Sequence, residues 1–282
     1  MSETKPCEYH RKVPCGNLGE AVDFPDGTHY VCSRGIEEWN ATHENKIFRK
    51  GFLPHSDAGI NSPGSATTSA SKVFASMAMS LDGMIAGPNR GPRNPLGDHG
   101  PDLHSWAFSQ EAFRRNLHLG PGGETGTDNR ILESTIKRTG AHILGKRMFE
   151  EGEPNWPEDA PFHTPVFVLT HERREPWERK GGTTFYFVND GIESALRQAR
   201  KAAGAKDIRV SGGADVVSQF LNAGMIDELS IALVPMFLSD GLRLFDGVDK
   251  QNVSLKIVEA VQSSSVTHIR YAVMPMAARS QS

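Results

Sequence analysis

From residue 72 onward, hydrophobic positions alternate between short runs typical of buried strands and the wider spacing typical of amphipathic helices. Apolar runs predict strands at residues 73–79, 141–144, 165–170, 183–188 and 208–210. Apolar residues at helical spacing predict helices whose N-termini lie near Asp128, Lys146, Asp190 and Gly213. Three further runs, at 228–234, 254–261 and 267–274, follow one another without helices between them, which is typical of antiparallel strands.

This alternation predicts an α/β fold. We expect a mainly parallel sheet with helices on both faces and antiparallel edge strands. Between the first strand and the first long helix, residues 86–127 are rich in Gly and Pro and predict a long irregular stretch. Long loops in compact domains are often functional.

A change in composition divides the chain. Residues 57–71 consist mainly of Gly, Ser, Ala and Thr, which predicts a flexible linker between an N-terminal segment, 1–56, and a body, 72–277, with a tail at 278–282. The body is long enough for a sizeable core. A segment as short as residues 1–56 usually needs a metal ion or a disulfide to fold alone.

The overall charge narrows the function classes. The 282 residues carry a formal net charge of −3, which argues against a chain built to bind nucleic acid or an anionic membrane. No apolar run is long enough for a membrane span, and the first residues lack the apolar core of a signal peptide. Because 3 Cys cannot form a complete set of disulfides, we expect a reducing, cytoplasmic setting. As a partner we expect a small molecule rather than nucleic acid or a membrane.

Three strand ends carry residues suited to anion binding. The strand at 208–210 continues into Ser211-Gly212-Gly213-Ala214 and a helix, so free N–H groups at the helix start are available to a phosphate. A tight turn that simply needs glycine explains this pattern equally well. Gly145-Lys146-Arg147 and Thr170-His171-Glu172-Arg173 follow two other strands. Strand ends of this kind predict one crevice for a nucleotide with several phosphates, and the arginines favour NADPH over NADH.

Two further features lie beside the predicted crevice. Asp82, directly after the first strand, is either an ordinary turn residue or a carboxylate that binds a polar substrate or orients a water. Trp106 in the long loop is suited to stacking on a flat heterocycle, although aromatic loop residues more often serve as packing anchors.

Several segments together resemble the RibD C-terminal (riboflavin-biosynthesis reductase) family. The segments are VFASMAMSLDGMIAG, AHILGKRMFEEG, PVFVLTHERREP and the long run from Gly181 to Gly247, and the resemblance extends from Val73 to about Met276. It implies a dihydrofolate reductase-like fold and NADPH dependence. The family's riboflavin members reduce the ribosyl group of a phosphorylated aminopyrimidine, and dihydrofolate reductases reduce a pteridine.

The resemblance also assigns roles to residues. It implies cofactor binding by Gly145, Lys146, Arg147, Thr170, His171, Arg173, Ser211, Gly212, Gly213 and Ala214. It implies substrate contacts at Ser80 and Asp82, and we add Trp106. The proton that accompanies hydride transfer has three candidate sources, which are Asp82 through water, Glu124 and Asp128.

The expected function is an NADPH-dependent reductase of a small heterocyclic substrate resembling a riboflavin precursor, of the 5-amino-6-(5-phosphoribosylamino)uracil reductase type. The alternatives are a dihydrofolate or pteridine reductase and a nucleotide-binding module without turnover. No deaminase domain with a zinc motif precedes the body, and residues 122–126 resemble a divergent branch of dihydrofolate reductase family proteins. We expect a homodimer because edge strands in this family commonly pair.

The N-terminal segment holds all three cysteines. Cys7, His10, Cys15 and Cys32 are spaced C-x2-H-x4-C-x16-C, which is a candidate ligand set for a structural Zn²⁺. The alternative is an arm whose cysteines are free thiols.

Overall fold

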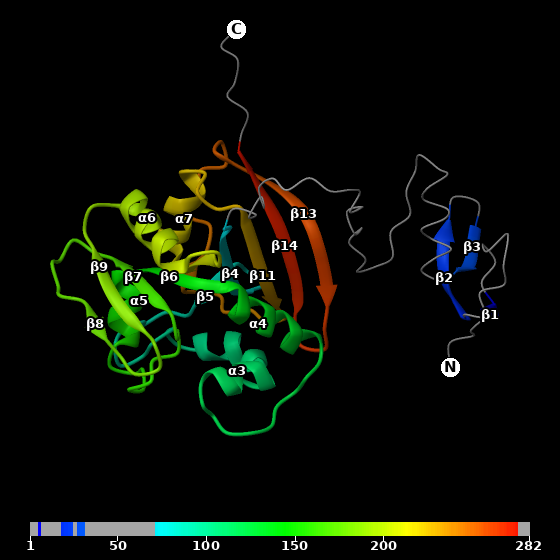
Figure 1. The fold of residues 1–282 in the computed structure, drawn as a ribbon, viewed down its shortest axis with the longest axis horizontal. Coiled ribbons are helices and arrows are strands. Elements are labelled where there is room, and N and C mark those ends of the chain that lie inside the picture. The colour runs from blue at the N-terminus through cyan, green and yellow to red at the C-terminus, as the bar shows by residue number, and fades with distance from the viewer. Residues whose placement is uncertain (1–4, 7–17, 25–26, 32–70, 276–282) are drawn as a thin grey trace, which may run out of the picture. The chain divides into compact units, whose positions relative to one another are not determined.

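The computed structural model describes residues 5–6, 18–24, 27–31 and 71–275 (Figure 1). The chain divides into two compact units, Met1–Ala66 and Thr67–Ser282. The predicted zinc ligands Cys7, His10, Cys15 and Cys32, residues 57–70 of the predicted linker and the tail at 278–282 all lie outside the described residues.

The first unit contains a small antiparallel sheet that the hydrophobic pattern did not predict. Its strands are β1 (Lys5–Pro6), β2 (Leu18–Phe24) and β3 (Gly27–Val31), in the order β1-β2-β3. Both strand pairs are antiparallel.

The second unit is organised around a nine-stranded sheet in the order β13-β14-β11-β4-β10-β6-β7-β9-β8. Its central strands are parallel: β11 (Glu228–Val234), β4 (Val73–Ser80), β10 (Asp207–Gly212), β6 (Thr139–Gly145), β7 (Pro165–Leu169) and β9 (Thr184–Val188). Antiparallel strands close both edges: β14 (Thr267–Pro275) and β13 (Val253–Gln262) on one side and β8 (Trp177–Glu178) on the other. A short ribbon pairs β5 (Met84–Ala86) with β12 (Leu242–Arg243).

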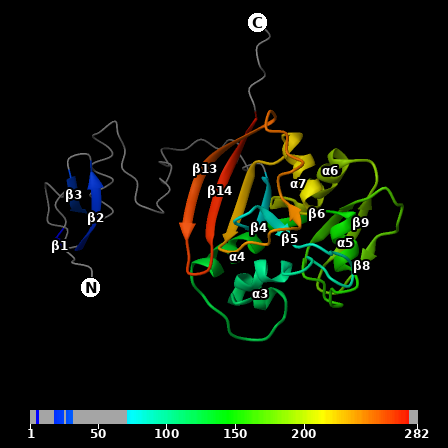
Figure 2. The ribbon, with the colours of Figure 1, turned by 180° about the vertical axis from the view of Figure 1, so that it is seen from behind.

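Helices cover both faces of this sheet. In Figure 1, α6 (Ile192–Ala203) and α7 (Ala214–Asn222) lie above it, and Figure 2 shows the same layer from behind. Below the sheet lie α3 (Glu111–Asn116) and α4 (Thr127–Arg138). The remaining helices are η1 (Gly100–His104), α2 (Ser105–Phe108) and α5 (Lys146–Gly152). The predicted α/β class, with a mainly parallel sheet, helices on both faces and antiparallel edges, is confirmed.

The face under α6 and α7 is apolar. Alternate residues of the central strands, such as Ala75, Ile143 and Val210, pack against Leu196 of α6 and Phe220 of α7 in one buried cluster. This pattern follows from the period of two in a strand, which places every second side chain on the same face. A second cluster, centred on Phe149 of α5, covers the opposite face at the β7–β9 end of the sheet.

The middle of the opposite face is polar. Registered neighbours there are Arg209 of β10 beside His142 of β6, and Ser76 of β4 beside Ser230 of β11. These side chains occupy the positions that alternate with the apolar cluster. The sheet therefore presents hydrogen-bonding groups, and the guanidinium of Arg209, to the space beneath α4.

Several local predictions were wrong in detail. The stretch 86–127 contains η1, α2 and α3 rather than only irregular chain. The strands β5, β8 and β12 were missed because two or three residues are too short to show a period. The N-caps of α4 and α6 are Gly126 and Gly191, not Asp128 and Asp190, so neither aspartate caps its helix.

Among the helices of the described residues, none combines the length and apolar character needed to cross a membrane.

The edge strand β13 carries three exposed apolar side chains, Leu255, Ile257 and Val258. The exposed fraction of Ile257 is 65%.

Candidate functional site

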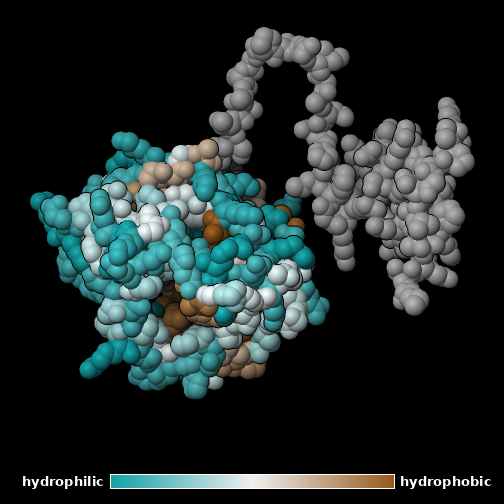
Figure 3. All heavy atoms as spheres, turned by 60° about the horizontal axis from the view of Figure 1, so that its bottom comes forward, coloured by the Kyte–Doolittle hydropathy of each residue, from teal (hydrophilic) through white to brown (hydrophobic). Residues whose placement is uncertain are grey.

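One cavity brings the three predicted strand ends together. Gly145 after β6, Thr170 after β7 and Ser211 of β10 all line it, as do parts of the polar sheet face and of α2 and α4. Its volume is about 1840 Å³. Since small-molecule pockets are typically about 300–1,000 Å³, this cavity has room for two ligands side by side. The face in Figure 3 has a hollow in which apolar residues are visible within a hydrophilic rim.

The glycine turn between β10 and α7 is open to a ligand. Gly212 has a φ of +130°, a conformation that L side chains rarely adopt. A Cβ added at Gly213 would meet nothing within 4 Å, and no side chain caps the start of α7. The first N–H groups of α7 therefore face space that an anion can approach closely.

Gly145 is needed for packing as well. A Cβ there would come within 2.9 Å of Val216 Cγ2 on α7, which is too close for an ordinary contact. The absence of a side chain at Gly145 thus lets α7 lie against the end of β6. Gly145 also lines the cavity, where α5 begins without a side-chain cap.

The cations predicted to bind anions differ in their ion pairing and in whether they line the cavity. The Lys146 ammonium donates to Glu172 and lies 3.5 Å from Glu150, and the Glu172 hydrogen bond raises the pKa of Lys146. Lys146 is therefore already paired. Arg147 and His171 line the cavity, whereas Arg173 is not among its lining residues.

Arg209 is the most unusual group of the cavity floor. Its guanidinium donates one hydrogen bond, from Nη2 to the carbonyl of Ser76 at 3.0 Å, and its buried Nε has no partner. Within residues 71–275, no carboxylate forms an ion pair with it, whereas Arg90, Arg138 and Arg270 in the same cavity are each paired with glutamate. Burial lowers the pKa of Arg209 to about 10, so it remains charged at neutral pH.

The histidines around Arg209 are neutral. Burial, reinforced by the charge of Arg209, lowers the pKa of His142 to about 3 and that of His104 to about 4. His142 Nδ1 lies 2.7 Å from the Ser211 hydroxyl, which links the floor to the glycine turn. Arg209 is consequently the one cation among these three floor groups. A bound anion is the partner that such a site lacks.

A carboxylate–imidazole pair lies on the opposite side of the cavity. His268 Nε2 of β14 is 2.7 Å from Asp128 Oδ1 of α4, and Asp128 is buried. The His268 ring lines the cavity and meets the edge of Trp106, whose centroid is 5.3 Å away. The buried indole Nε1 of Trp106 has no partner in the described part of the chain. Trp106 therefore lies at the cavity as predicted, with a donor available.

The predicted catalytic residue Asp82 lies elsewhere. Its carboxylate accepts hydrogen bonds from the Ser80 hydroxyl at 2.5 Å, from Leu238 N at 3.2 Å and from Ser239 N at 2.7 Å. The Ser80 hydrogen bond, followed by those backbone N–H groups, lowers the pKa of Asp82 to about 2. Neither Asp82 nor Ser80 is among the residues that line the cavity. Asp82 ties the β4–β5 turn to the loop at 236–239, and this geometry gives no support to proton delivery by it.

Glu124 also lies away from the cavity lining. It accepts a hydrogen bond from the Gln110 side-chain amide at 3.3 Å, and its backbone pairs with Ser109 and Glu111. Its contacts join α3 to the loop before α4, so the geometry gives no support to its predicted catalytic role. Of the three candidate proton sources, Asp128 has the contact with the cavity, through His268.

Sequence reasoning missed Arg209, His142 and His268. Arg209 and His142 interrupt apolar strands at positions whose neighbours are buried, so a charged or titratable residue on the inner side of a predicted strand was a usable signal. His268 carried no such local signal, since its partner Asp128 is 140 positions away.

Comparison with known proteins assigns this chain to a family. The family model of the RibD C-terminal domain matches residues 71–269. The uncharacterized proteins YyaP and YwjB of Bacillus subtilis (strain 168) are 38% identical over 86 residues and 26% identical over 85 residues. Each match covers 30% of this chain, and 45% of YyaP and 48% of YwjB, so it spans about half the length of these relatives.

Among solved structures, the chain is similar to the diaminohydroxyphosphoribosylaminopyrimidine deaminase/5-amino-6-(5-phosphoribosylamino)uracil reductase of Thermotoga maritima. The TM-score is 0.49 at 16% identity, over 74% of this chain and 58% of that one.

Replacing Asp82 with Asn should lower stability in a pH-dependent way, because an amide N–H would then face the N–H groups of Leu238 and Ser239. A carboxyl whose pKa falls from 3.8 to about 2 on folding stabilises the native state above about pH 4, and loses that contribution as the pH falls toward 2. The difference in free energy of unfolding between wild type and Asp82→Asn, measured by urea titration, should shrink over this range. Asp240→Asn, whose carboxylate bonds only the adjacent Gly241 N–H, is the control. A difference independent of pH would contradict this role for Asp82.

Replacing Arg209 with Met should weaken anion binding without lowering stability, because it removes a desolvated cation that lacks a counter-ion. Inorganic phosphate should raise the melting temperature of the wild type more than that of Arg209→Met, which keeps the glycine turn of α7 but lacks the buried cation. The control is Arg130→Met, which replaces an exposed arginine that lines the cavity and donates to the Thr127 hydroxyl. An equal phosphate effect in wild type and Arg209→Met would exclude Arg209 as the anion site.

Proposed function

The chain belongs to the RibD C-terminal domain family, and on this premise we propose that it is an NADPH-dependent reductase of a small heterocyclic substrate. The observation that carries the proposal is a single cavity that joins the open glycine turn of α7 to an unpaired arginine and a carboxylate–imidazole pair. When bound, the dinucleotide supplies the hydride, and the protein supplies binding, orientation and the proton.

The residues at the carboxyl ends of β10 and β6 fit a pyrophosphate. The open space at Gly213 and the uncapped N–H groups of α7 form the kind of cradle that a phosphate occupies. Ser211 and Ala214 flank this turn and also line the cavity. Arg147 and His171 lie on the same rim and are the groups that we assign to a 2′-phosphate. Lys146, already paired with Glu172, contributes less than its position in the sequence suggested.

The substrate that we propose is flat and carries an anionic group. Arg209 supplies a fixed positive charge. His142 and His104 beside it are neutral, so they add no second charge to this part of the cavity. Trp106 offers an aromatic edge and an indole N–H. A phosphorylated ribosylaminopyrimidine has these properties, which is why the riboflavin-precursor type is our first choice.

A pteridine that carries a carboxylate also satisfies Arg209, and it is the second candidate. The third alternative, a nucleotide-binding module, predicts dinucleotide binding with no oxidation of NADPH by either heterocycle. A screen of NADPH oxidation with both substrate classes separates the three.

We assign proton delivery to His268, with Asp128 as the positioning residue. The Asp128 carboxylate accepts from the Nε2 side of the ring, which fixes the orientation of the imidazole. The hydride acceptor gains electrons at carbon, and its nitrogen or oxygen then needs a proton from a group that touches the cavity. His268 is such a group, whereas Asp82 is held as an anion in its turn.

The cofactor assignment predicts that Gly213→Ala weakens NADPH binding while leaving the fold intact. The φ of Gly213 is −73°, and its added Cβ would enter the open space assigned to the ligand. NADPH and NADH affinities measured by calorimetry should show a preference for NADPH in the wild type and a loss in the variant. Gly126→Ala is the matched control, since Gly126 is also a helix N-cap with φ −71° and no atom within 4 Å of an added Cβ. An equal affinity in all three proteins, or no binding in the wild type, would contradict the assignment.

The proton assignment predicts that His268→Gln lowers kcat by about 100-fold or more, which is the usual contribution of a positioned acid, without changing NADPH affinity. Asp128→Asn should lower kcat less, because the imidazole remains. Stopped-flow measurement of NADPH oxidation with the substrate found in the screen gives these rates. A wild-type kcat in His268→Gln would remove the residue from the mechanism.

A further inference from the structure

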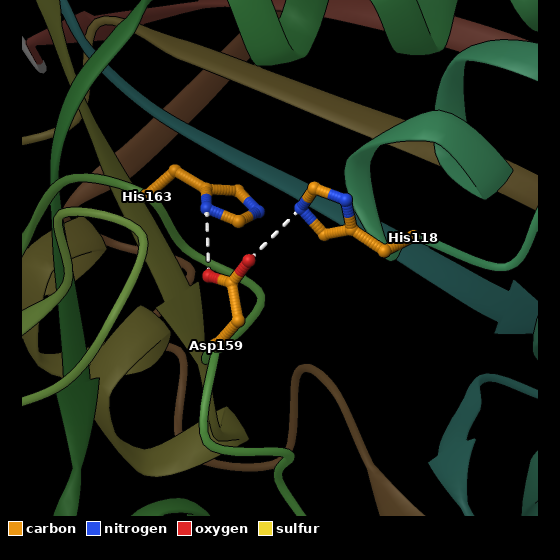
Figure 4. Close-up of side chains that lie close together, drawn as sticks. All are labelled: His118, Asp159 and His163. Atoms are coloured by element: carbon orange, nitrogen blue, oxygen red, sulfur yellow. Dashed lines mark ion pairs between the residues drawn. The ribbon is translucent and has the colours of Figure 1, made fainter.

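Two histidines and an aspartate lie close together next to residues of the cavity wall, separate from the groups discussed so far. His118 follows α3, and Asp159 and His163 belong to the segment between α5 and β7 (Figure 4). His118 Nε2 is 2.9 Å from Asp159 Oδ2, and His163 Nδ1 is 3.4 Å from Asp159 Oδ1. One ligand atom from each of the three lies within 4.8 Å of the others. Figure 4 shows both imidazoles turned toward the carboxylate between them.

The hydrogen bond of His163 Nε2 makes Nδ1 of the neutral ring an acceptor, although the atoms that Nδ1 faces are themselves acceptors. Its Nε2 lies 2.7 Å from the Asn116 carbonyl oxygen, which only accepts, so this nitrogen carries the hydrogen. In the neutral ring, Nδ1 is then an acceptor. It faces two further acceptors, the Gly181 carbonyl oxygen at 3.1 Å and Asp159 Oδ1.

The Asp159 carboxylate is held beside His163 Nδ1 but offers it no hydrogen-bond donor. Its Oδ1 is buried and has no hydrogen-bond partner among the described residues. Gly181 has a φ of +72°, and a Cβ there would collide with Asp159 Oδ1. Glycine at this position is thus what allows the carboxylate oxygen and His163 Nδ1 to approach each other. Acceptor atoms converge on one point, and a positive charge there would satisfy all of them.

We propose that His118, Asp159 and His163 bind one divalent transition-metal ion, with the Gly181 carbonyl beside them. Two imidazoles and a carboxylate form a ligand set suited to Zn²⁺ and its neighbours in the first transition row. Tetrahedral ligands about 2.1 Å from a zinc ion stand about 3.4 Å apart, which matches the His163–Asp159 separation of 3.4 Å. The Nε2–H bond to the Asn116 carbonyl orients His163 as outer-sphere partners orient histidine ligands elsewhere.

The ion would join two parts of the cavity wall. Asn116 and Leu117 immediately precede His118, Pro161 and Phe162 precede His163, and all four line the cavity. The Asn116 side chain already donates to the Pro161 carbonyl at 2.9 Å. A bound ion would hold these segments together, so its effect should be measurable as stability and without any assay of activity.

The test uses the full-length protein freed of metal with a chelator and titrated with Zn²⁺ by calorimetry. The variants are His118→Gln, whose side chain is 67% exposed and replaceable without disturbing the core, and Asp159→Asn, which keeps the shape of the side chain. We expect each variant to lose affinity for one zinc ion by at least 10–100-fold. At a hundredfold excess over Kd, Zn²⁺ should raise the melting temperature of the wild type by about 5–10 °C and that of the variants by much less.

Two controls separate this site from others. His99→Gln alters an exposed histidine that forms an ion pair with Asp102, away from the proposed ligands, and it should bind zinc like the wild type. Cys7→Ser should keep the binding event that His118→Gln loses, because any zinc held by the N-terminal cysteines is a separate event. Absence of zinc binding in the wild type, or the same isotherm in wild type, His118→Gln and Asp159→Asn, would overturn the proposal.

Discussion

The two unlike faces of the central sheet are the constraint on which the rest of this structure depends. Residues at alternate positions of β4, β6, β10 and β11 are apolar and pack under α6 and α7. The positions between them place Ser76, Arg209, His142 and Ser230 on the other face. Hydrogen-bonding groups and a cation cannot be covered by an apolar helix surface without a large desolvation cost. The space beneath α4 therefore stays open as a cavity, while the apolar face packs against α6 and α7.

A group of charge pairs around Arg138 lines one part of this cavity. At the amino ends of the strands, Arg138 of α4 bonds Asp207 at 2.7 Å and Glu228 at 2.6 Å and stacks over the Phe74 ring at 4.1 Å. These contacts anchor the C-terminal end of α4 to three strands. Arg138 is paired with two carboxylates, whereas Arg209 has no ion-pair partner among the described residues, so we assign the first to structure and propose the second as a ligand contact.

The same contrast separates the carboxylates. Asp82 is surrounded by hydrogen-bond donors and is held as an anion, as expected for a group that fixes a turn. Asp128 is buried with a single imidazole partner that reaches the cavity. Asp159 Oδ1 has no hydrogen-bond partner among the described residues and lies 3.4 Å from His163 Nδ1. The number of donors around each carboxylate, rather than its place in a motif, is the basis on which we assign Asp82 to structure and propose functional roles for Asp128 and Asp159.

Local patterns in the sequence were sufficient for most of the architecture. The strands β4, β6, β7, β9, β10, β11, β13 and β14 and the helices α4 to α7 were all predicted, because hydrophobic periodicity is a property of neighbouring residues. The glycine turn at 212–213 and its place at the cavity were predicted for the same reason. Only the tertiary structure decided which polar residues face one another. His268 meets Asp128 across 140 positions, and His163 meets the carbonyl of Asn116 across 47. Such contacts depend on how strands and helices pack, and nothing in the residues adjacent to either partner encodes them.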